Sequence, residues 1–143
     1  MKVEKNCLVK EDIYNYLVKV QNDFVTPINQ KVDLHDYSEK VFNIANIYDI
    51  KNGKEIIAIG ICYCNDYESY IAYLSLLSVS SEYQGKGIAS FLIQEIVKDV
   101  KETGMKEIDL HTENLIAEYI YKKNGFVEIE NVNNRKKMIL KLE

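Results

Sequence analysis

Residues 77 to 90 read LSVSSEYQGKGIAS, and the chain changes its structural pattern within this stretch. The preceding segment, residues 70–80, reads as a strand. Residues 87–103 carry apolar side chains at spacings of three and four, which is typical of a helix. Gly85 and Gly87 lie at the junction, where glycine permits a positive φ and lets a ligand approach the backbone closely. The sequence therefore predicts a strand, a glycine loop and a helix in immediate succession.

A helix that begins directly after a glycine loop can bind phosphate. Its first amides have no partner within the helix, and the helix dipole adds partial positive charge at that end. Lys86 would add a full charge. Two other phosphate motifs do not fit, because a dinucleotide fingerprint needs a third glycine where Ser90 stands, and a P-loop needs four residues between its glycines and then lysine. An ordinary loop with two glycines is the alternative at this point.

The flanking patterns predict the rest of the fold. Asn52-Gly53 favours a tight hairpin, so the strands on either side should be antiparallel neighbours. We expect an α/β protein of the α+β type, with a single domain over residues 1–143 and a central mixed, mostly antiparallel sheet of six to seven strands flanked by about four helices. The predicted helices are 11–24, 34–46, 87–103 and 115–123, and the predicted strands are 3–9, 47–50, 55–64, 70–80, 106–111, 126–130 and 136–142.

Composition narrows the classes of function. The net charge is −4, and the basic residues are scattered among acids apart from the short run Arg135-Lys136-Lys137. A nucleic-acid binder usually shows a basic footprint, so no nucleic-acid partner is expected. No apolar run approaches the roughly 20 residues of a membrane span, and residues 1–6 lack the apolar core of a signal peptide. We therefore expect a cytoplasmic protein with no membrane partner. Three cysteines and two histidines give no metal motif, and Cys62 and Cys64 should share one face of a strand.

A second block follows about 25 residues after the glycine loop. Residues 114–126 read NLIAEYIYKKNGF, which places Ala117, Tyr121, Gly125 and Phe126 at successive spacings of three, four, four and one from Asn114. Together with Gln-x-x-Gly-x-Ala at residues 84–89, this block resembles the GNAT superfamily of acetyl-CoA-dependent N-acetyltransferases. The resemblance spans residues 55–143. Many relatives have proline where Ser81 stands, a change that affects loop stiffness more than chemistry.

The resemblance implies a set of cofactor-binding residues. Backbone groups of residues 77–79 would hold the pantetheine arm and the acetyl carbonyl, amides from residues 85–90 would hold the pyrophosphate, and Asn114 would bind the pantetheine region. The implied set is Leu77, Ser78, Val79, Gln84, Gly85, Lys86, Gly87, Ile88, Ala89, Ser90 and Asn114. Acetyl-CoA would be the co-substrate, with no metal. Homodimers are common in the family, so a homodimer is a further expectation.

Tyr121 is the expected general acid, because the resemblance places it near the sulfur. A phenol has a pKa near 10 and a thiol one of about 8.5, so proton transfer to the leaving thiolate is uphill by only about 2 kcal/mol. The competing reading is that Tyr121 is core packing, since the chain has 11 tyrosines. For the general base, some relatives have a carboxylate at the position of Asp109. Other candidates are Glu113, His111 and Glu68.

The acceptor is expected to be a small-molecule amine, such as an amino sugar, that attacks directly in a ternary complex. In the family the first two helices and their loop often line the acceptor cleft, so the resemblance implies that residues 23–34 do so here. Their mix of aromatic, apolar and acidic side chains suits a small polar amine, and it suits core packing equally well. Two alternatives stay open. One is a protein or peptide N-acetyltransferase, and the other is a non-catalytic acyl-CoA sensor or regulatory module. The presence of Tyr121 favours an enzyme over a sensor.

Overall fold

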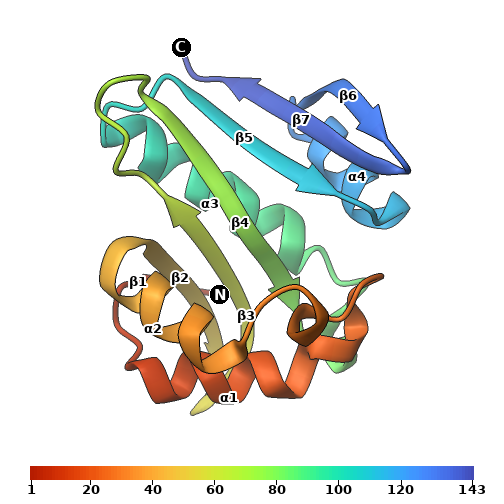
Figure 1. The fold of residues 1–143 in the computed structure, drawn as a ribbon. Helices are drawn as coiled ribbons and strands as arrows, with labels where there is room; N and C mark the ends of the chain where they lie inside the picture. Colours follow the sequence, from red (N-terminus) through yellow and green to blue (C-terminus); the bar gives the residue numbers. More distant parts are fainter.

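A computed structural model describes all 143 residues as one seven-stranded sheet with helices on both faces (Figure 1). The strand order is β1-β2-β3-β4-β5-β7-β6, and only β4 and β5 are parallel neighbours. The strands are β1 (Glu4–Lys5), β2 (Asn46–Asn52), β3 (Glu55–Tyr63), β4 (Ile71–Val79), β5 (Glu107–Thr112), β6 (Val127–Val132) and β7 (Arg135–Lys141). The α-helices are α1 (Lys10–Val20), α2 (Leu34–Ile44), α3 (Ile88–Glu102) and α4 (Leu115–Lys123). The expected mixed, mostly antiparallel sheet with four helices is confirmed.

The sheet splits between β4 and β5. The two strands pair over only four residues, from Ile71 opposite Glu107 to Leu74 opposite Leu110. Beyond Leu74 they diverge, as the green and cyan arrows show in Figure 1. A register shift against β3 leaves Ser75 as an extra residue in β4, which is a β-bulge and bends a strand. The split leaves one side of the second half of β4 without a neighbouring strand.

Two apolar clusters fix the layers. Helices α1 and α2 pack on one face against side chains such as Ile59 and Ile61, while α3 packs on the other through Leu92 and Ile96. Successive strand residues point to opposite faces, so one strand can serve both clusters. Gly60 allows the close approach of α3, because a Cβ at this position would overlap the Ile96 Cδ1 atom.

Helix boundaries differ from the predicted ones mainly in the first half. Helix α1 ends at Val20, and a short 3-10 turn, Gln21–Asp23, replaces its predicted last turn. In α2 the buried face is formed by Leu34, Ser38 and Val41, whereas Ile44, the last residue of the helix, is 47% exposed. The apolar pattern of the sequence does not reveal this face, because one of its buried residues is a serine. The Ser38 hydroxyl donates to the Leu34 carbonyl oxygen at 2.7 Å, which allows it to be buried. None of the helices is both long enough and apolar enough to cross a membrane.

Candidate active site

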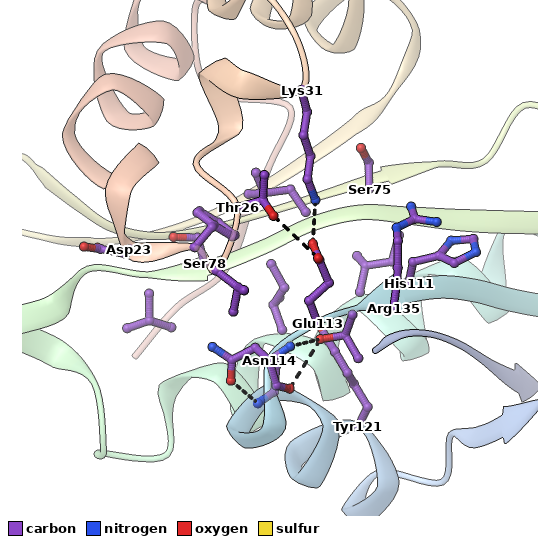
Figure 2. Close-up of a pocket in the computed structure, with 18 of the residues that line it drawn as sticks. Asp23, Thr26, Lys31, Ser75, Ser78, His111, Glu113, Asn114, Tyr121 and Arg135 are labelled. Carbon is purple, nitrogen blue, oxygen red and sulfur yellow. Dashed lines mark hydrogen bonds and ion pairs between the residues drawn. The ribbon is translucent and has the colours of Figure 1, made fainter. Parts of the chain in front are cut away.

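A cavity of about 350 Å³ occupies the split between β4 and β5 (Figure 2). It is bounded by the segment between α1 and α2, by β4, by the end of β5 and by α4. The lining residues include Thr26, Lys31, Tyr73, Ser75, Leu77, Ser78, Val79, Gln84, His111, Glu113, Asn114, Tyr121 and Arg135. The expected acceptor segment and part of the expected cofactor-binding set thus meet at one cavity.

The β4 backbone presents free amides to this cavity. The Ser80 amide donates to the Ile57 carbonyl oxygen of the β3 side at 2.8 Å. Amides alternate sides along a strand, so those of Leu77 and Val79 point the opposite way, into the split. The Val79 carbonyl oxygen, on the same side, accepts from Gln84 Nε2 at 2.9 Å. Amides with no strand partner can polarise an acyl carbonyl group placed beside them.

The glycine loop has the backbone geometry of an anion site. Gly85 and Gly87 have φ of 77° and 81°, the left-handed region that favours glycine. Gly87 is the N-cap of α3, no side chain caps the helix, and the first amide bonded within it is that of Phe91, which donates to the Gly87 carbonyl oxygen. The preceding amides of this turn are therefore available to a phosphate.

The structure places the predicted cofactor residues in two groups. Leu77, Ser78, Val79, Gln84 and Asn114 line the cavity. Residues 85–90 lie outside its lining, at the start of α3. Within that group the Ile88 side chain is buried in the core, and the Ser90 hydroxyl accepts from Asn124 Nδ2 of the α4 C-cap at 3.1 Å. The role expected of this group depends on its backbone amides, so these side-chain contacts do not conflict with it, and it stays a prediction.

Asn114 has a structural role as well as a place in the cavity. Its Oδ1 atom caps α4 by accepting from the amides of Ile116 at 2.8 Å and Ala117 at 3.0 Å. Asparagine is among the best N-cap residues for this reason. The Nδ2 group makes no hydrogen bond within the chain and is left for a ligand.

Tyr121 projects from α4 toward the cavity (Figure 2) and is 6% exposed. Its ring packs on Phe126, with the ring centroids 5.6 Å apart. Burial raises the pKa of the phenol well above its ordinary value of 10, and no other group offsets that effect. The phenol is thus protonated at neutral pH and has no hydrogen-bond partner in the chain, so it can donate to a ligand atom.

Tyr73 and His111 form a hydrogen-bonded pair on the other wall. The phenol oxygen of Tyr73 lies 2.7 Å from His111 Nδ1, and both side chains line the cavity. Burial, followed by the positive charges of Arg135 and Lys137, lowers the pKa of His111 below 6.5. The imidazole is therefore neutral at pH 7, the state in which it can accept a proton.

The three carboxylates considered as bases lie in different places. Asp109 lines neither this cavity nor its neighbour, and its Oδ2 atom is 3.7 Å from Lys137 Nζ. Burial and the nearby Glu107 raise the pKa of Asp109 to about 6. Glu113 lines the cavity but is bound to Lys31 at 2.9 Å. Glu68 is exposed in the turn before β4, outside the lining.

Sequence reasoning missed three polar residues of the site, namely Tyr73, Ser75 and Arg135. Tyr73 stands opposite Asp109 in the parallel register of β4 and β5. Alternation along β5 then brings His111 toward the same side. The sequence contains the alternation but not the register, so only a correct alignment of these two non-sequential strands would have found the pair.

The fold and the cavity together indicate a class of protein. A sheet that splits beside a helix start with free amides, with free strand amides and a buried phenol nearby, offers the groups that an extended phosphate-bearing acyl donor would need. A protein-family model described as "Acetyltransferase (GNAT) domain" matches residues 43–128, more than half of the chain. The chain therefore belongs to the GNAT acetyltransferases, and acetyl-CoA is the co-substrate of this domain.

Individual relatives are more distant. N-alpha-acetyltransferase MAK3 of Arabidopsis thaliana is 33% identical over 70 residues, 47% of this chain and only 37% of that protein. The paia N-acetyltransferase of Thermoplasma acidophilum, solved in complex with coenzyme A, is similar with a TM-score of 0.77 and 19% identity over 99% of both chains. The structure of the NatC complex bound to Gag peptide and CoA gives a TM-score of 0.74 and 23% identity over 100% of both chains.

Proposed function

We propose that this protein transfers the acetyl group of acetyl-CoA to the α-amino group of a polypeptide, by direct attack within a ternary complex. One observation carries the proposal: an unpartnered phenol, Tyr121, and a neutral imidazole, His111, line the same cavity beside the free amides of β4. A transfer from thioester to amine needs an acid, a base and a carbonyl-polarising donor.

Three groups of the cavity each serve one step of the transfer, and together they account for the protons and bonds. Acetyl-CoA supplies the activated acetyl group as a thioester. The Val79 amide stabilises the negative charge that develops on the carbonyl oxygen when the amine nitrogen forms its bond to carbon. His111 accepts the proton that the amine loses, and Tyr73 orients the imidazole through their hydrogen bond. Tyr121 donates a proton to the sulfur as the carbon–sulfur bond breaks, and water restores the phenol.

His111 is the preferred base because of its position. It lines the cavity, whereas Asp109 is held between Glu107 and Lys137 outside it. His111→Gln should therefore lower kcat more than Asp109→Asn does. An equal or larger loss of kcat in Asp109→Asn would contradict the assignment of His111 as the general base.

The acceptor is inferred from the shape of the site and from the relatives. A second cavity of about 340 Å³ shares His111, Glu113 and Arg135 with the first, so an acceptor could extend past the reacting position. MAK3 is named as an N-alpha-acetyltransferase and the NatC structure contains a peptide. A small-molecule amine is the second candidate, favoured by the volume of the first cavity, which is at the small end of ligand pockets.

The decisive experiment compares the wild type with Tyr121→Phe. We expect calorimetry to show acetyl-CoA binding to both, and a thiol-release assay with a peptide panel to show a kcat about 10²- to 10⁴-fold lower for the variant. Unchanged turnover would remove Tyr121 from the acid role. Binding of acetyl-CoA by the wild type without turnover on any peptide or small amine would favour an acyl-CoA sensor.

A further inference from the structure

Arg135 is the only arginine in the chain. It begins β7 directly after the β6–β7 turn, where Asn133 and Asn134 have φ of 53° and 66°. Its side chain lines both cavities, and Figure 2 shows the guanidinium near His111. The chain thus places one planar cation at the junction between the reacting position and the second cavity.

The neighbouring charges leave Arg135 without a carboxylate partner. No Asp or Glu oxygen lies within 4.0 Å of its guanidinium, whereas Lys136 binds Glu118 at 2.6 Å. Glu113, which lines both cavities, is neutralised by Lys31 at 2.9 Å. Glu130, the other acid of the second cavity, stands opposite Lys137 in the β6–β7 register, while Arg135 stands opposite the apolar Val132.

The second cavity is polar. Val132 is its one apolar lining residue among seven, the others being His111, Glu113, Glu130, Asn133, Arg135 and Lys137. A guanidinium offers two parallel N–H groups that match the two oxygens of a carboxylate, a geometry that an ammonium cannot reproduce. A guanidinium that has no carboxylate partner and lies beside a polar cavity therefore favours an anionic group on the ligand.

We propose that the second cavity is a specificity subsite in which Arg135 binds a carboxylate close to the reacting amine of the acceptor. This inference rests on the proposed acetyl transfer and narrows its substrate class to primary amines with a neighbouring acidic group. Two sources supply that chemistry. One is an Asp or Glu side chain directly after the N-terminal residue of a polypeptide, and the other is the α-carboxylate of a free amino acid.

The kinetic test compares matched acceptors. C-terminally amidated peptides that differ only in residue two, with Asp compared with Asn and Glu with Gln, test whether a side chain supplies the carboxylate. Free amino acids compared with their amides test whether the α-carboxylate supplies it. We expect kcat/KM about tenfold higher for the acidic member of the pair that supplies the carboxylate. The preference should disappear in Arg135→Gln, recover in part in Arg135→Lys, and invert toward Lys-containing peptides in Arg135→Glu.

The ratio of kcat/KM for the acidic and the amide acceptor of each pair separates recognition of the carboxylate from effects on catalysis. Arg135 also lowers the pKa of His111, so its loss changes the rate for every acceptor, but that change cancels in the ratio. Lys54→Gln is the matched control, because Lys54 is another exposed cation at a hairpin turn. Equal kcat/KM for acidic and amide acceptors, or a preference that persists in Arg135→Gln, would overturn the proposal.

A second readout does not need turnover. Phenylglyoxal modifies guanidinium groups, and mass spectrometry of this protein would report one site only. Acidic acceptors should slow the modification of Arg135, and their amide counterparts should not. If no acceptor is acetylated although acetyl-CoA binds, the acetyl-transfer proposal has failed, and this protection assay still decides whether Arg135 binds carboxylates. Equal modification rates with both ligands would then reject the subsite as well.

Discussion

The Tyr73 hydroxyl and His111 Nδ1 lie 2.7 Å apart across the parallel pair of strands β4 and β5, just before those strands separate. The hydrogen bond fixes the imidazole plane at the edge of the cavity. It joins two side chains that are 38 residues apart in the chain, so it depends on the sheet register. The pH dependence of the reaction should report on this pair.

We expect the log of kcat/KM to rise with pH through the pKa of His111, below 6.5, because only the neutral imidazole accepts a proton. The positive charge of Arg135 helps to keep that pKa low. In Arg135→Gln the imidazolium forms more easily, so the rising limb should move to higher pH. A stopped assay over pH 5–8 would measure it, with each rate divided by the fraction of acceptor amine that is neutral at that pH. A limb that moves to lower pH, or that survives in His111→Gln, would contradict the assignment.

Gly87→Ala should weaken both folding and CoA binding. A Cβ at φ 81° costs about 1–2 kcal/mol of backbone strain, and it would stand beside the amides that face the phosphates. Gly53→Ala is the matched control, since Gly53 has φ of 64° in a distant hairpin and, like Gly87, no atom within 4 Å of an added Cβ. Urea unfolding should show similar losses in both variants. Calorimetry should show at least a tenfold weaker CoA affinity only for Gly87→Ala.

Glu113 ties the segment between α1 and α2 to the end of β5 across the cavity, through Lys31 at 2.9 Å and Thr26 at 3.5 Å (Figure 2). Exposed ion pairs contribute about 1 kcal/mol or less, so Glu113→Gln should leave the melting temperature nearly unchanged. Hydrogen exchange in residues 24–33 should nevertheless become faster. Glu4→Gln, which removes the exposed Lys2–Glu4 pair, should leave that exchange unchanged. Identical exchange in the two variants would show that Glu113 does not restrain the segment.

Asp109 should make the protein less stable as pH rises. Its folded-state pKa of about 6 lies above the ordinary value of 3.8, so the folded protein holds a proton that the unfolded chain releases. The free energy of unfolding should therefore fall between about pH 4 and pH 6. Asp109→Asn removes this loss, so the variant should exceed the wild type by about 1–2 kcal/mol at pH 7 and match it near pH 4.

Urea titrations at unit steps of pH would measure this difference. The exposed Glu39→Gln variant should follow the wild-type curve at every pH. A wild-type stability that is flat from pH 4 to pH 6 would show that the Asp109 carboxyl titrates normally in the folded protein.

Local patterns carried most of the fold prediction. The predicted α4 matches Leu115–Lys123 at both ends, since Asn114 and Gly125 mark them chemically. Strands β2 to β4 were predicted as antiparallel neighbours because short turns join them. The backbone of the anion site was visible in the two glycines for the same reason, since its chemistry is local.

The acceptor side was less predictable because it is built from distant segments. Alternation along β5 places Asp109 on the face opposite Ile108 and Leu110, but alternation alone does not show that Asp109 is only 9% exposed. Arg135 was not predicted as a site residue, because a short basic run beside a turn is typical of a solvated surface until β7 is placed next to β5.

The unpartnered phenol of Tyr121 also has a consequence for product inhibition. Under the proposed mechanism the spent cofactor leaves as a thiol, but bound CoA can also ionise to a thiolate, and a thiolate sulfur accepts a hydrogen bond from this buried donor more strongly than a thioester sulfur does. Free CoA should then compete with acetyl-CoA at lower concentration than acetyl-CoA itself requires, and turnover would follow the ratio of the two. Tyr121→Phe should bring the two affinities together in a calorimetric comparison.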